Sequence, residues 1–342
     1  MNTMRKWIGL LLAVALLLGI VGCAKAEEPE SQSAPTEAVA QQSPQDVRQS
    51  ILDDQLSQTA QWLLTQIPEP VNGSVGGEWM ILGLARGEAQ VPGGFYDNYF
   101  ERLAEHTAEE GGVLHSRKYT EYSRVILALT AIGRDPRDVG GYDLIQPLAD
   151  FDQTVFQGIN GAIFALLALD SGGYDIPQAP ADSTQATREG YLSYILDREC
   201  TDGGWALSGD EADVDITAMA LQALAKYQEQ QEVAAAVERG ITRLSQMQQE
   251  DGGYTAYGSQ SSESISQVLV ALAELGLDVE DERFVKNGVT LKDKLLQYRL
   301  EDGSFRHTLE EEADLMATEQ AFYALVALAR VQAGASSLYS MQ

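Results

Sequence analysis

One turn motif recurs along the sequence at a spacing of about fifty residues. An Asp-Gly-Gly-aromatic or Asp-Gly-Ser-aromatic turn occurs at 202–205, 251–254 and 302–305, and the aspartates are 49 and 51 residues apart. A weaker copy, Glu-Gly-Gly-Val, occupies 110–113. A fixed period of this length is typical of stacked supersecondary units that bury their apolar faces against one another. The chain is therefore expected to fold as a repeat array.

A helix-like segment precedes each turn and a second one follows it. Glycines in the turns end the helices and supply positive φ. The same plan extends upstream in a less regular form, so the sequence predicts six helical hairpins and no strand. The expected pairs are 47–66 with 76–86, 97–109 with 120–132, 142–151 with 157–170, 183–198 with 211–227, 232–249 with 262–276, and 281–299 with 312–331.

The second helix of each pair is apolar nearly all round. The runs around Ala223 and Ala271, for example, read AMALQALA and QVLVALAEL. A helix without a polar face is buried on all sides, whereas the first helices carry charged residues such as Glu238, Arg239 and Arg243 among their apolar positions. This contrast predicts an all-α fold, an α/α toroid with buried helices in an inner ring and half-exposed helices in an outer ring.

The charge of the chain excludes several classes of function. Lys plus Arg is 23 and Asp plus Glu is 51, which gives a formal net charge of −28. A non-specific nucleic-acid binder needs the opposite balance, so no nucleic-acid partner is expected. Two cysteines exclude a disulfide-stapled scaffold, and three histidines offer little material for a metal site. We therefore expect no metal and no resident cofactor.

The first 46 residues carry targeting signals rather than fold. Arg5 and Lys6 precede an apolar stretch at 8–22, which is too short for an ordinary membrane span and fits a signal sequence. Small residues precede Cys23, as in the bacterial lipobox, so Cys23 is the predicted lipidation site; the alternative is an ordinary secretory signal that contains a cysteine. The predicted organisation is a signal peptide at 1–22, a flexible tether at 23–46 and the toroid at 47–342. The protein would be held on the extracytoplasmic face of a bacterial membrane by its lipid alone.

The repeat resembles that of the terpene cyclase/prenyltransferase superfamily. Residues 248–254 match its Gln-x-x-Asp-Gly-Gly-aromatic turn, while the copies elsewhere carry Glu199 and Arg299 at the Gln position. The block at 120–177 is similar to Gram-positive surface proteins whose toroid is like the α-domain of intrinsic factor and transcobalamin. The resemblance implies a squalene cyclase-like toroid with a central funnel. It also makes cobalamin a possible ligand. In intrinsic factor and transcobalamin a second domain closes over the bound cobalamin, and we expect the funnel here to lack that domain.

Polar residues open the inner helices and therefore line one mouth of the expected funnel. In the helix alignment Thr120, Asn160, Asp215, Glu263 and Glu319 share one position. These residues either cap free N–H groups or converge on a ligand. Arg124 needs a carboxylate partner if it is buried, and Glu78 or Glu121 can serve. The candidate ligand-binding residues are Glu78, Trp79, Glu121, Tyr122, Arg124, Asn160, Glu263 and Glu319.

The segment Asp213-Val214-Asp215-Ile216-Thr217 resembles the Asp-x-Asp-Asp-Thr motif of class II terpene cyclases. By that resemblance Asp215 is the candidate general acid and Asp213 its neighbour, because paired buried carboxylates keep a proton available. Ile216 departs from the motif, and the inner helices carry few of the aromatic residues that stabilise carbocations.

A protein prenyltransferase is also disfavoured, because its zinc needs an Asp, a Cys and a His that converge at the funnel. Apart from Cys23, the predicted mature fold contains only Cys200, and this cysteine follows an outer helix. The leading hypothesis is non-catalytic binding of a small molecule or another surface protein in the funnel. The alternatives are a terpene cyclase-like enzyme that uses Asp215 and a structural or adhesive surface module.

Overall fold

The computed structural model describes residues 44–256 and 258–342, which lie within one compact unit. The predicted signal peptide, Cys23 and most of the predicted tether lie outside the described residues. Helix α1 begins at Pro44, three residues before the expected start of the repeat region.

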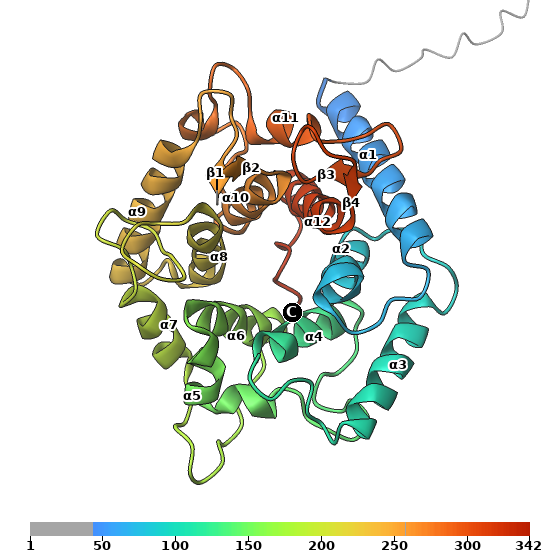
Figure 1. Cartoon of the computed structure of the whole chain (residues 1–342), viewed down its shortest axis with the longest axis vertical. Helices are drawn as coiled ribbons and strands as arrows, with labels where there is room; N and C mark the ends of the chain where they lie inside the picture. The colour runs from blue at the N-terminus through green and yellow to red at the C-terminus, as the bar shows by residue number, and fades with distance from the viewer. Residues whose placement is uncertain (1–43, 257) are drawn as a thin grey trace, which may run out of the picture. The chain divides into compact units, whose positions relative to one another are not determined.

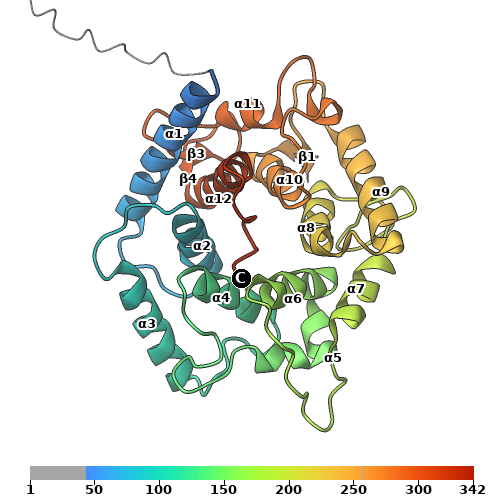
Figure 2. The same cartoon turned by 180° about the vertical axis from the view of Figure 1, so that it is seen from behind.

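The helices of this unit form two concentric rings (Figures 1 and 2). The inner and outer helices alternate along the chain, so each outer helix is followed by an inner one. The outer helices are α1 (Pro44–Gln66), α3 (Phe95–Glu109), α5 (Phe151–Thr154), α7 (Arg188–Leu196), α9 (Gln231–Met247) and α11 (Leu291–Leu296). The inner helices are α2 (Trp79–Arg86), α4 (Thr120–Ala131), α6 (Ile159–Ser171), α8 (Val214–Leu224), α10 (Ser262–Glu274) and α12 (Leu315–Gln332). The predicted α/α toroid of six pairs is confirmed.

Burial follows the pattern that the sequence predicts. Nearly every residue of α6 from Ile159 to Leu169 is buried, because its neighbours in the inner ring and α7 cover it. Helix α9 buries only one stripe, which includes Val233, Val237 and Ile241, and exposes its charged face. An apolar stripe at three- and four-residue spacing is what a half-exposed helix needs.

Two outer helices are much shorter than expected. In place of the single helix expected at 142–151, the chain forms the 3-10 helix η2 (Gln146–Ala149), then α5 and the 3-10 helix η3 (Val155–Gln157). At 281–299 the 3-10 helix η5 (Glu282–Phe284) is separated from α11 by the Asn287-Gly288 turn. Both residues of this turn have positive φ, 50° and 80°, and a bridge joins Lys286 to Val289. Such a tight hairpin turn is incompatible with a continuous helix.

Two small hairpins precede inner helices, although no strand was expected. Strands β1 (Thr255–Ala256) and β2 (Ser259–Gln260) pair before α10, and β3 (Phe305–Arg306) and β4 (Ala313–Asp314) pair before α12. Each hairpin follows one of the repeated turns, so these turns lead into the N-terminal ends of the inner helices. Two further irregular segments are η1 (Ser74–Glu78), before α2, and η4 (Ala225–Tyr227), after α8.

The repeated turns at 202–205, 251–254 and 302–305 each contact the helix pair that follows. In each of the three turns, the aspartate contacts a side chain from the outer helix of that following pair. These contacts are Asp202 with Arg243 of α9, Asp251 with Lys294 of α11, and Asp302 with Trp62 of α1. The first two contacts are ion pairs, and the third, with the neutral Trp62 side chain, joins the last pair to the first and so helps to close the ring.

Further contacts tighten this closure. The Thr59 hydroxyl donates to the Gly303 carbonyl oxygen at 2.7 Å, and Arg299 donates to the Gln58 side-chain oxygen at 2.7 Å. Gly303 has a φ of +93°, and a Cβ there would lie 2.9 Å from the Gln58 carbonyl. Glycine is therefore required in this turn both by its backbone conformation and by the close approach of α1.

The last ten residues, 333–342, leave α12 and run into the centre of the ring (Figure 1). In the described part of the chain, no single helix is both long and apolar enough to cross a membrane. Two consecutive segments, Phe151–Gln157 and Ile159–Ser171, reach that length and apolar character when taken together, but the chain bends by 118° between them.

Candidate functional site

A cavity of about 320 Å³ opens where α8, α10 and α12 begin. The two hairpins lie beside it, because the repeated turns deliver the chain to this end of the ring. The lining residues are mostly polar and come from these three helices and the segments before them. They are Asp215, Met219, Ala256, Ser259, Ser261, Glu263, Gln267, His307, Met316 and Gln320.

Asp215 lies in the first turn of α8 and is half-buried. Its Oδ1 atom is buried and has no hydrogen-bond partner among the described residues. Burial raises the pKa of this carboxyl group to about 6; Asp213 and Glu263 raise it further, and a hydrogen bond from Ser264 opposes them. Asp213 itself caps α8, since its Oδ1 accepts the Ile216 N–H at 2.9 Å.

Glu263 pairs with His307 across the cavity wall. The histidine Nδ1 lies 2.9 Å from both carboxylate oxygens of Glu263. Burial alone would lower the pKa of His307, but the hydrogen bond and the charge of Glu263 outweigh it and raise the pKa above 6.5. The pair therefore places a second carboxyl group and an imidazole with a raised pKa in the same cavity as Asp215.

Glutamine side chains connect this cavity to the middle of the ring. Gln267 donates to the Tyr323 hydroxyl at 2.7 Å and to the Gln320 side-chain oxygen at 3.0 Å. Gln222 of α8 donates in turn to the side-chain oxygen of Gln267 at 3.0 Å. These hydrogen bonds link α8, α10 and α12 beside the cavity.

A second group of acids lies at the start of α2 and α4. The Glu78 carboxylate accepts from Arg124 Nε at 3.4 Å, and Arg124 also pairs with Glu121. The buried Arg124 thus has both of the carboxylate partners that the sequence offers. Burial raises the pKa of Glu78 to about 7, although Arg124 and the Gly73 N–H, which Glu78 Oε1 accepts at 2.9 Å, oppose the shift.

Glu319 of α12 holds the loop that leads into α2. Its Oε2 accepts the Gly76 N–H at 2.8 Å, while Oε1 is buried without a hydrogen-bond partner in the described residues. The side chain is 1% exposed, and burial raises the pKa of its carboxyl group to about 8, with Glu78 and Asp314 adding to the rise. Glu319 therefore carries a structural hydrogen bond across the joint between the last and first inner helices.

The other candidate residues have different environments. Trp79 of α2 contacts Phe164 of α6 and Tyr323 of α12, with ring centroids 5.7 and 5.8 Å apart. These aromatic side chains meet inside the inner ring. The Tyr122 hydroxyl accepts the Leu114 N–H at 3.1 Å, so it reaches a loop before α4 and not the cavity. Asn160 has a buried Oδ1 atom with no partner in the described ranges.

The candidate site residues that the sequence indicates thus include two separate groups. Asp215 and Glu263 line the cavity, whereas Glu78, Glu121, Arg124 and Glu319 form a separate group of which none lines it. Sequence reasoning missed His307, which follows the third turn aromatic by two residues, as Ala256 follows the second. Aligning the residues after each turn would have placed both at the cavity.

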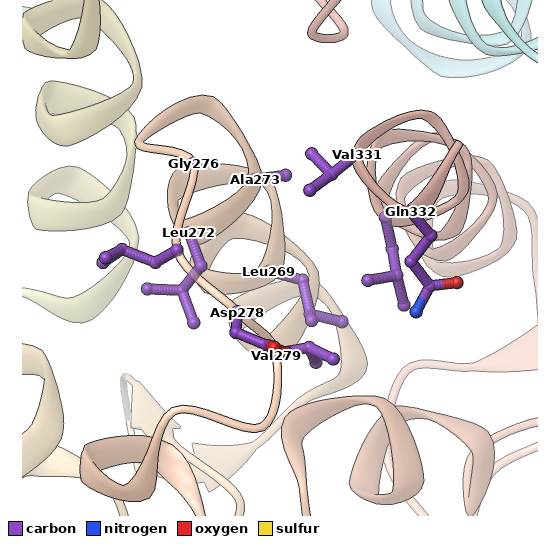
Figure 3. Close-up of a pocket in the computed structure, with 10 residues that line it drawn as sticks. Leu269, Leu272, Ala273, Gly276, Asp278, Val279, Val331 and Gln332 are labelled. Carbon is purple, nitrogen blue, oxygen red and sulfur yellow. The ribbon is translucent and has the colours of Figure 1, made fainter. Parts of the chain in front are cut away.

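Another cavity, of about 250 Å³, lies at the opposite ends of α10 and α12 (Figure 3). The residues that line it are largely aliphatic and include Leu269, Leu272 and Val331, which Figure 3 labels. It lacks converging polar groups, so the cavity beside Asp215 is the better candidate site. In residues 44–256 and 258–342 no group of three or more His, Cys, Asp or Glu side chains is arranged to hold a metal ion.

Comparisons with known proteins agree with this architecture. Residues 185–282 match the family model of the squalene-hopene cyclase C-terminal domain. The chain therefore has a squalene cyclase-like α/α toroid, and the resemblance that the repeated turns indicate is confirmed. A comparison with curated protein sequences finds no match.

Solved structures share the fold at low sequence identity. A polysaccharide lyase matches with a TM-score of 0.54 and 13% identity over 84% of this chain and 98% of its own. An unsaturated glucuronyl hydrolase from Bacillus sp. GL1 matches with a TM-score of 0.53 and 14% identity over 86% and 99%. A type II terpene cyclase from Scytonema, bound to its product merosterolic acid A, matches with a TM-score of 0.51 and 14% identity over 83% and 99%. Likeness at this level of identity establishes the fold alone.

Proposed function

We propose that this toroid binds a small polar molecule in the cavity beside Asp215, without catalysing its conversion. The observation that carries the proposal is the open cavity whose lining brings together the Asp215 and Glu263 carboxyl groups and the His307 imidazole. A few polar groups that converge on one cavity are typical of a site that binds a small molecule. The lining also offers Ser259, Ser261 and Gln320 as polar partners.

The charge of the lining favours a ligand with a cationic or multiply hydroxylated group. Two carboxylates, Asp215 and Glu263, line the cavity against the single imidazole of His307. Met219, Met316 and Ala256 offer an apolar wall for the rest of the molecule. A volume of about 320 Å³ accommodates a small organic molecule. Cobalamin, which the family resemblance raises, is much larger and would have to extend out of the cavity.

A ligand screen tests this function. Purified protein is examined by thermal shift and then by calorimetry with alkylamines, amino sugars, neutral sugars and cobalamin. We expect at least one amine or sugar to raise the melting temperature of the wild-type chain, and Asp215→Asn to weaken its binding about tenfold or more. Glu105→Gln, an exposed site on α3, is the matched control. A screen in which no ligand binds, or in which Asp215→Asn binds as well as the wild type, refutes the proposal.

The raised pKa of Asp215 favours a second candidate, a terpene cyclase-like enzyme. A carboxyl group with a pKa of about 6 is protonated in about one molecule in ten at pH 7, far more often than an ordinary aspartate, and can act as a general acid. The polar lining weighs against this candidate, because apart from the His307 imidazole it supplies no aromatic side chain near Asp215 for a carbocation. Incubation with polyprenyl substrates decides between them: turnover that Asp215→Asn abolishes establishes the enzyme.

The proposed setting of this binding protein is the extracytoplasmic face of a bacterial membrane. The lipobox-like sequence before Cys23 supports lipid anchoring. Metabolic labelling with an alkyne fatty acid is expected to label the wild-type protein and not Cys23→Ser. If both proteins are unlabelled, the anchor proposal fails. A structural or adhesive role is the remaining alternative, and binding to host or cell-wall material that survives Asp215→Asn would favour it.

A further inference from the structure

The segment 333–342 lies at the end of the ring opposite the Asp215 cavity. It follows α12 and enters the centre at the C-terminal ends of the inner helices (Figure 2). Leu338 is fully buried and Tyr339 is 6% exposed, although both belong to a segment without helix or strand. The Ser340 N–H donates to the Ser337 carbonyl oxygen at 3.3 Å, so the ring contains a groove that accepts a chain segment with a turn at Leu338 and Tyr339.

Two arginines hold the backbone of this segment. Arg86, the last residue of α2, donates to the carbonyl oxygens of Leu338 at 3.0 Å, Ser337 at 2.6 Å and Ser340 at 3.0 Å. Arg330 of α12 donates to the Ser336 carbonyl oxygen at 2.8 Å. The same guanidinium donates to the Arg86 carbonyl oxygen at 2.8 Å, which fixes the two arginines beside each other.

Groups from three other inner helices accept from the segment. Glu274, the last residue of α10, accepts the Tyr339 N–H at 3.3 Å and the Ser337 hydroxyl at 2.7 Å. The Gln222 side-chain oxygen on α8 accepts the Tyr339 hydroxyl at 3.4 Å. The Ser171 carbonyl oxygen at the end of α6 accepts the Met341 N–H at 2.9 Å.

This pattern is that of a peptide in a binding groove. Side chains of the ring mainly recognise backbone atoms of the segment, and the ring buries the aliphatic side chain of Leu338 and the phenol of Tyr339. Backbone recognition supplies affinity, and the burial of particular side chains supplies selectivity. A cavity of about 260 Å³ remains beside the segment, between Leu167, Ala223 and Tyr339, so the groove is larger than its present occupant.

We propose that the C-terminal mouth of the inner ring is a peptide-binding site that the chain's own residues 335–342 fill in cis. The ligand class is a segment of a partner protein that turns at an aliphatic residue followed by a tyrosine, with small polar residues on both sides. The partner must displace the tail, because the cis segment competes at a high effective concentration. Gly334, with a φ of +66°, lies where the tail departs from α12.

A labelled peptide tests the site in the full chain. The probe is a fluorescein-labelled peptide with the sequence of residues 335–342, Ala-Ser-Ser-Leu-Tyr-Ser-Met-Gln. In the double variant Leu338→Ala/Tyr339→Ala the tail loses both anchoring side chains, while every groove residue is retained. We expect the probe to bind this variant at least tenfold more tightly than the wild type. A probe with alanine at both anchor positions should bind neither protein.

Two comparisons sharpen the result. Adding Arg86→Gln to the double variant should weaken probe binding about tenfold or more, because it removes donors to the backbone. A folded double variant, as judged by circular dichroism, that binds the probe no better than the wild type overturns the proposal. A wild-type dimer that becomes a monomer in the double variant also overturns it, since the occupant is then the tail of a second copy.

Hydrogen exchange of the wild type gives an answer even if the double variant does not fold. The Tyr339 and Met341 amides are hydrogen-bonded to the ring, as the amides of α12 are within their helix. A displaceable tail opens without the ring, so its amides should exchange at least tenfold faster than that of buried Leu328. Equal rates would mean that the tail opens only with the whole fold, and the groove would then not be a binding site.

Discussion

Replacing Glu319 with glutamine should reduce the pH dependence of folding stability between pH 5 and pH 8.5. The pKa of this carboxyl group rises from 4.5 to about 8 on folding, because the side chain is buried. Below pH 4.5 the group is protonated in both states. As the pH rises further, the unfolded chain loses the proton while the folded chain keeps it, so stability falls until the pH exceeds about 8.

Linkage sets the size of this effect. If the pKa is 4.5 in the unfolded chain and about 8 in the folded chain, the maximum loss is about 5 kcal/mol, at ~1.4 kcal/mol for each tenfold change in proton affinity. Side-chain relaxation and water entry reduce such penalties, so we expect about 2 to 4 kcal/mol. Glutamine retains an oxygen for the Gly76 N–H, which Glu319 accepts at 2.8 Å.

The measurement is urea unfolding of the wild type and Glu319→Gln at pH 5 and at pH 8.5. Glu78, Asp215 and Glu274 also have raised pKa values, so both proteins lose stability with pH, and the difference between the two losses isolates Glu319. Glu105→Gln on α3 is exposed and serves as the control. Equal losses in the wild type and Glu319→Gln would refute the assignment of a protonated carboxyl group at this joint.

Three further predictions concern the turns and the cavity. Trp205→Ala removes a fully buried indole and should lower the free energy of unfolding by about 3–5 kcal/mol in urea titrations; a loss below about 1 kcal/mol would contradict its place in the core. Thr59→Val removes the hydrogen bond to Gly303 that helps close the ring, and calorimetry should record a loss of about 1–2 kcal/mol. In NMR titrations His307 should have a pKa above 6.5 that falls in Glu263→Gln, and the pair's contribution to stability should disappear as the pH rises through that value; an unchanged pKa would exclude the ion pair.

The sequence predicts the architecture because the repeated turns and the apolar inner helices are local patterns. It fails where a local turn interrupts an apparent helix. Asn287 and Gly288, with φ of 50° and 80°, form a tight turn between Lys286 and Val289, inside the helix expected at 281–299. The two-residue turn signal is present there in the sequence but is outweighed by the expected repeat length.

The candidate site was predictable in part. Asp215 and Glu263 lie where an alignment of helix starts places them, because inner helices with the same register begin at one end of the ring. The pairing of Glu263 with His307 depends on the β3–β4 hairpin, whose position is set by tertiary packing. The burial of Tyr339 was not predictable, since a short segment after the last helix carries no periodic signal that reveals what covers it.

The contact between Asp302 and Trp62 has a consequence for how such a chain can change over time. An open solenoid tolerates the gain or loss of whole units, because each new unit meets a neighbour on one side and water on the other. Here the last unit must meet the first, so adding or deleting fifty residues would leave two mismatched edges. Diversity in this lineage should therefore arise inside units of constant number, and above all in the loops at the two mouths.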